Sequence, residues 1–179
     1  MINYYLDFKI NILRYLKLNK KETMYQKINK DVDNKIQAII EGDYDVSILG
    51  TLGKEGYPFL SKILPMYHNN RIYILISDLS EHTQNIKLND KVSFYFSMKE
   101  INNTKLNNPR LTVNGSISKL QLNKSNSQYI DLLKNYQKID KGSKMWGMFS
   151  DFNFYFFKPS RALYIEGFGK AYQKYYPTN

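Results

Sequence analysis

The sequence predicts a mainly β fold with flanking helices, an α+β arrangement in which short antiparallel strands form a small barrel. Seven short segments have the patterns of strands, most of them with apolar and polar side chains alternating with a period of two and one of them uniformly apolar. Most of these segments follow one another in hairpin order, and amphipathic segments with helical periodicity stand among them. The chain divides into a predicted N-terminal helical extension, residues 1–42, and a barrel domain, residues 43–179.

The N-terminal extension contains one clear helical pattern. Thr23 and Gln26 have the spacing of a helix capping box, and Gly42 fits a helix end. We therefore expect an amphipathic helix of about five turns from Thr23. Residues 1–20 are partly apolar without clear periodicity, so both a short packed helix and a mobile arm remain open. The apolar face of the expected helix consists of Tyr25, Ile28, Val32, Ile36 and Ile39.

Three strands are expected next along the chain. The first covers residues 46–52 and turns at residues 53–56, and the second is predicted as continuous from Pro58 to Met66. The turn Asn69-Asn70 leads into the apolar run Ile72–Ile76. Because this run is apolar at every position, we expect a central strand that is buried on both faces.

Four further strands complete the expected barrel. A helix marked by Tyr129 and Tyr136, followed by a loop that carries Trp146, lies between the strand at Arg110–Leu120 and the strand at Asn153–Lys158. Pro159 has no backbone N–H, so it fits only an interruption or an edge of the sheet. The strands are Val92–Ser97, Arg110–Leu120, Asn153–Lys158 and Arg161–Glu166.

A short helix is expected directly after the central strand. Asp78 stands three residues before Glu81, which is capping-box spacing, so Asp78 is the predicted N-cap. Polar side chains gather at this helix start, which we expect to be exposed, beside backbone N–H groups without helical partners. Such a cluster suits a phosphate or carboxylate, and a capped helix that binds nothing also fits these residues. The side chains are Ser77, Ser80, His82, Thr83 and Asn85.

The charge balance is strongly basic, with a net charge of +10. Basic residues are spread singly, without a basic helix face or zinc-finger spacing, so nucleic acid is not expected as a partner. A basic surface equally attracts small polyanions such as phosphorylated cofactors or haem propionates. The sequence contains no Cys, and no apolar run approaches the roughly 20 residues that span a bilayer. Without a signal-peptide core, we expect a cytoplasmic protein with no membrane partner.

Four motifs occur in order along the chain: GYPFLS (56–61), ISDLSEHTQN (76–85), RLTVNG (110–115) and SDFNFYFFKPSRALYIEGFGKAY (150–172). Together they resemble the FMN-binding split-barrel superfamily of pyridoxamine phosphate oxidase, and most closely its haem-iron-utilisation branch, the HugZ-type haem oxygenases. The resemblance implies an antiparallel split β-barrel that forms a homodimer with two cofactor sites at the subunit interface. We expect the aromatic strands Val92–Met98 and Asn153–Phe157 to add apolar area for that interface.

The resemblance also implies a set of cofactor-binding residues. In this superfamily the flavin phosphate lies near the ends of the second and third strands and the helix that follows. Arg110 matches the basic residue that this branch keeps near its cofactor, although a surface ion pair would explain it equally. The residues placed around the anionic group of FMN, or of haem as the alternative cofactor, are Ser61, Lys62, Ser77, His82, Thr83 and Asn85.

Members of this branch that degrade haem commonly place a histidine just after the GFG-x-A motif, where this sequence has Tyr172. The candidate ligand of a haem iron is therefore Tyr172 or His82, and tyrosinate favours the ferric state. No catalytic residue is assigned, because no nucleophile, carboxylate pair or metal cluster is recognisable. Three functions remain open: a haem-degrading enzyme, a flavin-dependent oxidoreductase of the pyridoxamine phosphate oxidase type, and a carrier of haem or flavin.

Overall fold

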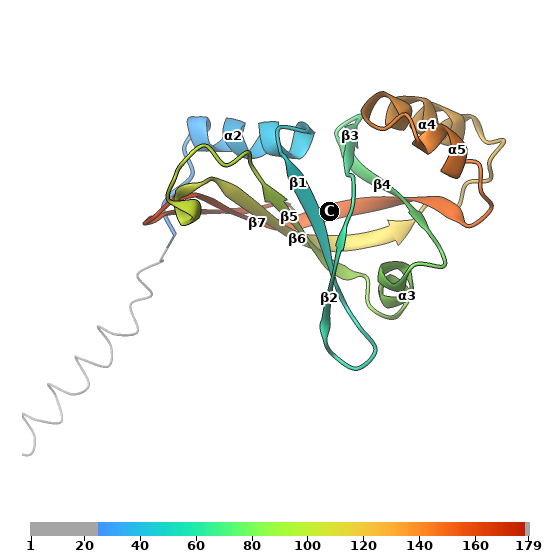
Figure 1. The fold of residues 1–179 in the computed structure, drawn as a ribbon, viewed down its shortest axis with the longest axis horizontal. Coiled ribbons are helices and arrows are strands. Elements are labelled where there is room, and N and C mark those ends of the chain that lie inside the picture. The colour runs from blue at the N-terminus through green and yellow to red at the C-terminus, as the bar shows by residue number, and fades with distance from the viewer. Residues whose placement is uncertain (1–24, 178–179) are drawn as a thin grey trace, which may run out of the picture.

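A computed structural model describes residues 25–177 (Figure 1). All strands lie in one antiparallel sheet of eight strands, in the order β2-β1-β5-β6-β7-β4-β3, with β8 paired to β7. The predicted antiparallel fold with flanking helices is confirmed. The strands are β1 (Val46–Leu52), β2 (Pro58–Lys62), β3 (Met66–His68), β4 (Arg71–Ser77), β5 (Lys91–Ser97), β6 (Arg110–Lys119), β7 (Phe152–Gly167) and β8 (Lys170–Tyr175).

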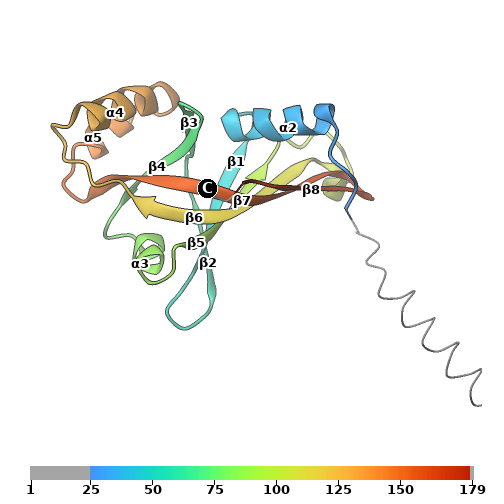
Figure 2. The same cartoon turned by 180° about the vertical axis from the view of Figure 1, so that it is seen from behind.

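The helices lie on both sides of this sheet. In both views, α2, α4 and α5 are on one side and α3 is on the other (Figures 1 and 2). No helix within residues 25–177 is long and apolar enough to cross a membrane. The helices are α2 (Lys30–Glu41), α3 (Glu81–Leu88), α4 (Ser127–Ile139), α5 (Ser143–Trp146) and the short 3-10 helix η1 (Lys105–Asn107).

Strand β4 is buried on both faces, as its uniformly apolar sequence predicts. Ile72, Ile74 and Ile76 face the core inside the barrel, which α2 also joins. Tyr73 and Leu75 point the other way, into a second apolar cluster formed with α4 and β7. The end of β4 at Ser77 is therefore fixed between two packed cores, which holds the chain rigidly where it enters α3.

The strand expected from Pro58 to Met66 is two strands in the structure. Strand β2 ends at Lys62 and β3 begins at Met66, and these two strands lie at opposite ends of the sheet. The chain crosses from one end to the other through residues 63–65. Pro65 has no N–H for a sheet hydrogen bond, which favours an interruption here. This crossing marks the split of the barrel.

The strands expected at Asn153–Lys158 and Arg161–Glu166 form one continuous strand, β7, of 16 residues. Its register against β6 shifts between Asn114 and Gly115, where Gly115 pairs with Pro159 and Asn114 with Arg161. The extra residue, Ser160, makes a β-bulge that accommodates Pro159 without ending the strand. The sequence did not predict β8, which continues the sheet after the turn at Gly169.

Helix α2 begins later than expected. Its N-cap is Asn29, whose side chain accepts a hydrogen bond from the backbone N–H of Val32 at 2.9 Å. The helix has 12 residues and not five turns, because Gln26 is extended and its N–H bonds to the carbonyl of Ala171 on β8 at 2.8 Å. The other half of the expected capping box, Thr23, and the helix or arm expected at residues 1–20 lie outside the described residues.

Candidate functional site

The largest set of predicted site residues meets in one pocket at the split of the barrel, which we call the split pocket. Its volume is about 740 Å³, within the range of small-molecule sites. Lys62, Ile63 and Leu64 contribute to it from the crossing between β2 and β3. The other lining residues are Asp45, Leu75, Ile76, Ser77, Ser80, His82, Tyr136, Ile139, Asp140, Trp146 and Phe152.

The start of α3 forms the polar end of the split pocket. The N-cap is Ser80, and its side chain makes no capping hydrogen bond to the helix. The prediction of Asp78 as the N-cap is wrong, because its carboxylate is bonded to Lys119, Asn153 and Tyr155 instead. The first amide N–H groups of the helix therefore have no side-chain acceptor, and such groups attract anions.

His82 contributes a buried polar atom without a partner. Its Nε2 atom is shielded from solvent and has no hydrogen-bond partner in the described structure. Burial lowers the pKa of His82 below its usual value, so the imidazole is neutral at neutral pH. The hydroxyl of Ser61, on β2 beside α3, is likewise buried and without a partner. Because buried polar groups are normally paired, the unpaired Nε2 of His82 fits a site that receives a polar ligand or water, whereas Ser61 does not line the split pocket.

Thr83 and Asn85 point into the protein and not into the split pocket. Thr83 is 0% exposed and its hydroxyl donates to the Ser77 carbonyl at 2.7 Å. Asn85 is 3% exposed and its amide donates to the Thr51 hydroxyl at 3.1 Å. The expectation that this part of the helix start is exposed is therefore wrong, since these two side chains anchor α3 to β4 and β1.

Ser77 lines the split pocket, but its hydroxyl is engaged. It donates to the carboxylate of Asp151 and accepts the backbone N–H of Leu79 at 3.1 Å. A hydroxyl has only one hydrogen to donate. In this arrangement Ser77 has no hydrogen left for an anion. Ser80, His82 and Lys62, together with the indole N–H of Trp146, are the other side-chain donors among the lining residues.

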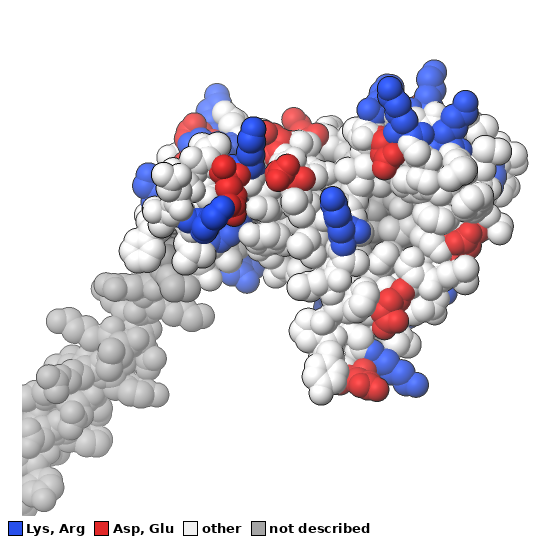
Figure 3. Space-filling view, viewed as in Figure 1, with Lys and Arg blue, Asp and Glu red and all other residues white. Residues whose placement is uncertain are grey.

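The split pocket is lined by charges of both signs, the positive Lys62 and the negative Asp45 and Asp140, and the exposed surface around it is rich in lysine. Lys62 is an exposed residue at its wall. Lysine and arginine side chains also gather over α4 and α5 (Figure 3), and a positive field of this kind raises the local concentration of anions. The exposed lysines of this region are Lys134, Lys138, Lys141 and Lys144.

Aromatic side chains form the apolar wall. The ring of Trp146 lies 5.3 Å from that of Phe152 and 6.0 Å from that of Tyr136, measured between centroids. Tyr136 is anchored by a 2.5 Å hydrogen bond from its hydroxyl to the Leu64 carbonyl. These rings bring α4, α5 and β7 to the pocket and are inclined to one another, by 86° between Tyr136 and Trp146 and 53° between Trp146 and Phe152, so they give the pocket an apolar side against which an aromatic ligand can pack.

Arg110 and Tyr172 lie at the other end of the sheet from α3. Arg110 opens β6 and donates to the carbonyls of Leu106 at 3.0 Å and Asn108 at 3.3 Å. The opposite end of β6 is Lys119, about 30 Å away along the strand at about 3.3 Å per residue. Tyr172 is 8% exposed, stacks on Tyr164 and does not line the split pocket. Of the eight predicted site residues, Lys62, Ser77 and His82 line the split pocket, and Ser61, Thr83 and Asn85 do not. Within one chain, Arg110 and Tyr172 lie away from it.

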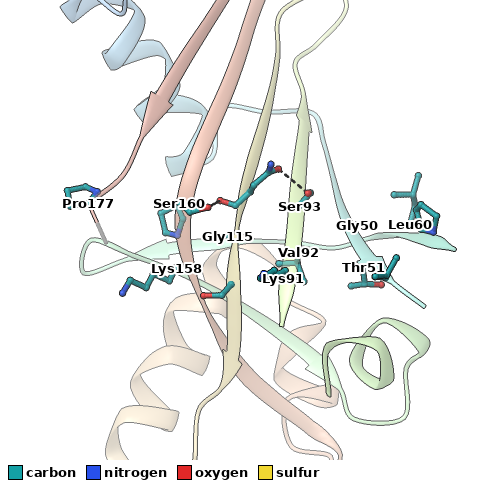
Figure 4. Close-up of a pocket in the computed structure, with 15 residues that line it drawn as sticks. Gly50, Thr51, Leu60, Lys91, Val92, Ser93, Gly115, Lys158, Ser160 and Pro177 are labelled. Carbon is teal, nitrogen blue, oxygen red and sulfur yellow. Dashed lines mark hydrogen bonds between the residues drawn. The ribbon is translucent and has the colours of Figure 1, made fainter. Parts of the chain in front are cut away.

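A second hollow, the sheet-face groove, has a volume of about 680 Å³ and crosses β1, β5, β6 and β7 on the outer face of the sheet (Figure 4). Ser93 and Ser160 flank Asn114 there, bonded to its side-chain and backbone oxygens at 3.0 Å each. Leu60 stands at the β2 side and is 66% exposed. Leu60, at the apolar edge of the groove, lies on the same strand, β2, as Ser61 and Lys62.

An open antiparallel barrel with flanking helices defines a protein of the split-barrel superfamily, similar to pyridoxamine phosphate oxidase. The chain belongs to the CREG beta-barrel family, which it matches over residues 45–177. The resemblance found from the four sequence motifs is thus confirmed. A search of curated proteins finds no match.

Solved structures with the same fold include three from bacteria. ChuZ of Campylobacter jejuni is 21% identical, with a TM-score of 0.73 over 90% of this chain and 65% of its own. HutZ, the haem storage protein of Vibrio cholerae, is 17% identical, with a TM-score of 0.61 over 72% and 89%. A haem-binding protein of Mycobacterium smegmatis is 19% identical, with a TM-score of 0.67 over 76% and 55%. At these identities, the likeness shows the fold alone.

Proposed function

We propose that the protein binds FMN in the split pocket, with the phosphate at the start of α3 and the ring system against the aromatic wall. The observation that carries this proposal is the meeting of an uncapped helix start, the unpaired Nε2 of His82 and the cation of Lys62 in one pocket. Each of these groups alone is ordinary. Together they offer backbone amides, a neutral imidazole and an ammonium group to one anion.

The other predicted residues hold this arrangement in place. Thr83 and Asn85 fix α3 against the strands through their internal hydrogen bonds, and Ser77 fixes the corner through Asp151. Their role is to orient the donors and not to touch the phosphate. This division explains why polar residues crowd the helix start although only some of them line the pocket.

FMN supplies the redox chemistry when it is bound, and the protein supplies position, charge and exclusion of water. Trp146, Phe152 and Tyr136 give the ring system an apolar surface. Among residues 25–177, no group of three or more histidine or carboxylate side chains is placed to hold a metal ion. With FMN bound, the protein would be a cofactor-binding protein of oxidoreductase type, without an assigned catalytic side chain.

We further propose that the site is completed in a homodimer. Part of the aromatic surface expected at the interface is not available, because Phe94, Phe96, Phe154 and Phe157 are at most 1% exposed and fill the cores of one chain. Tyr95 and Phe156 of the same strands are only partly buried. The sheet-face groove offers an uncovered apolar surface. Leu60 lies on β2 next to Lys62, which lines the split pocket, so a second copy seated in the groove would lie beside that pocket. That second copy could then contribute its own Arg110 to the site.

The dimer proposal predicts that Leu60→Lys shifts the protein towards monomers. The lysine would lose the apolar contact of Leu60 and place a charge in the interface, so we expect the dimer dissociation constant to rise at least about tenfold. Sedimentation velocity over a concentration series measures this shift. Leu88→Lys is the matched control, because Leu88 is also 66% exposed but does not line the groove. A wild-type monomer at micromolar concentration would contradict the dimer.

Haem is the second candidate cofactor. The named function of HutZ and of the Mycobacterium smegmatis protein supports it, and the split pocket offers His82 Nε2 as an imidazole ligand. Tyr172 is the other candidate, but its ring is packed among Tyr164 and the core residues. Of these two, His82 fits a ligand in the split pocket better.

Absorption titrations of the purified protein with FMN and with haemin test the proposed function. We expect FMN to bind with a shifted and sharpened flavin spectrum. A strong Soret band on addition of haemin, with no change of the flavin spectrum on addition of FMN, would show that the cofactor is haem and not FMN. If neither compound binds, the proposed function is wrong.

A further inference from the structure

The corner between β4 and α3 is held by a carboxylate that the proposed cofactor site does not use. Asp78 follows the last residue of β4 and directs its side chain towards the sheet. One of its oxygens accepts hydrogen bonds from Lys119 Nζ at 2.7 Å and from Asn153 Nδ2 at 2.8 Å. The other oxygen accepts the hydroxyl of Tyr155 at 3.0 Å. One carboxylate thus ties the corner to β6 and β7.

The backbone of the same corner is tied as well. The N–H of Asp78 donates to the carbonyl of Asp151 at 2.7 Å, and its own carbonyl accepts the side chain of Gln84 at 2.5 Å. The neighbouring Ser77 hydroxyl donates to the carboxylate of Asp151. The corner is therefore fixed on both sides of Asp78, within four residues of both Ser80 and His82.

An acidic residue beside an anion site needs an explanation, because a free carboxylate would repel a phosphate. Here Lys119 neutralises the charge at contact distance. Burial opposes ionisation of Asp78, but the hydrogen bonds from Lys119 and Tyr155 outweigh it and hold the pKa of Asp78 below its usual value. The Asp78 side chain is 25% exposed, so solvent partly screens the ion pair with Lys119.

We propose that Asp78 is a positioning residue for the cofactor site: its bonds to Lys119, Asn153 and Tyr155 hold the β4–α3 corner so that Ser80 and His82 converge on the anion. This inference rests on the proposed function. It differs from a purely stabilising role, in which the loss of Asp78 would lower the melting temperature without changing the geometry of the pocket.

The first test uses the cofactor-free protein. The chain has only two histidines, so the imidazole ¹⁵N resonances of His82 are assigned by comparison with His82→Gln. We expect Asp78→Asn to shift these resonances. Asp33→Asn is the matched control, because Asp33 also pairs with a lysine, Lys174, but on α2 away from the pocket. Unmoved His82 signals in a folded Asp78→Asn protein would overturn the positioning role, whether or not FMN binds.

The second test is a double-mutant cycle on FMN affinity, measured well below the melting temperature of every variant. We expect Asp78→Asn to weaken FMN binding about tenfold and Tyr155→Phe about threefold. Because Tyr155 acts through Asp78, adding Tyr155→Phe to Asp78→Asn should cause no further loss. Additive losses, or wild-type affinity in Asp78→Asn, would overturn the inference while leaving FMN binding intact. If the wild-type protein fails to bind FMN, the proposed function itself fails.

Discussion

Lys62→Glu is expected to weaken FMN binding about a hundredfold. The change removes a charge-assisted contact and places a carboxylate beside the phosphate, effects worth about 3 kcal/mol together. Lys62 is exposed at the end of β2, so the fold has no buried contact to lose there. Fluorescence titration with FMN measures the loss, and circular dichroism checks that the melting temperature stays close to that of the wild type.

The matched control is Lys54→Glu. Lys54 is an exposed lysine in the turn between β1 and β2, and it does not line the split pocket. The two variants change the net charge by the same amount, so any general effect of lower charge appears in both. Equal losses of affinity in the two variants would show that FMN responds only to the overall field and not to a contact with Lys62.

Thr83→Glu is expected to destabilise the fold strongly. Thr83 is 0% exposed and its hydroxyl bonds to the Ser77 carbonyl. A glutamate there would bury an unpaired charge and exceed the available space, which costs about 3 kcal/mol or more. For a chain of this size the melting temperature should fall by roughly 10 °C. Thermal unfolding followed by circular dichroism measures it.

The neighbour Gln84 provides the control for this second prediction. Gln84 is exposed in the same first turn of α3. Glu is well tolerated near a helix N-terminus, and Gln84→Glu loses only the exposed bond from this side chain to the Asp78 carbonyl, so it should change the melting temperature by only a few degrees. A Thr83→Glu protein as stable as Gln84→Glu would mean that Thr83 is not buried, contrary to the packing described above.

The sequence predicts the fold best where a local pattern matches the packing. The unbroken apolar run of β4 allows only a strand with both faces buried, and the structure confirms it. The sequence predicts the local structure less well where that structure depends on residues far away in the sequence. Gln26 would suit a capping box, but pairing with β8 holds it extended. Pro159 suggests the end of a strand, but a bulge opposite Gly115 lets β7 continue.

The candidate site divides in the same way. Its polar end comes from residues adjacent in the sequence at the start of α3, so the motif reveals it. Its aromatic wall comes from Tyr136, Trp146 and Phe152, which only the tertiary packing brings to the pocket. Nor does a sequence show which hydroxyls are already bonded, and this is why Thr83 seemed available. The buried hydrogen bond to Ser77 becomes visible only in three dimensions.

A comparison of FMN with riboflavin tests the central claim most directly, because the two compounds differ only in the phosphate. If the start of α3, His82 and Lys62 receive that phosphate, FMN should bind at least about a hundredfold more tightly than riboflavin at low salt. The difference should shrink as the ionic strength rises, because one exposed cation contributes to it. Equal affinity for FMN and riboflavin would show that the split pocket does not recognise an anion and would contradict the account.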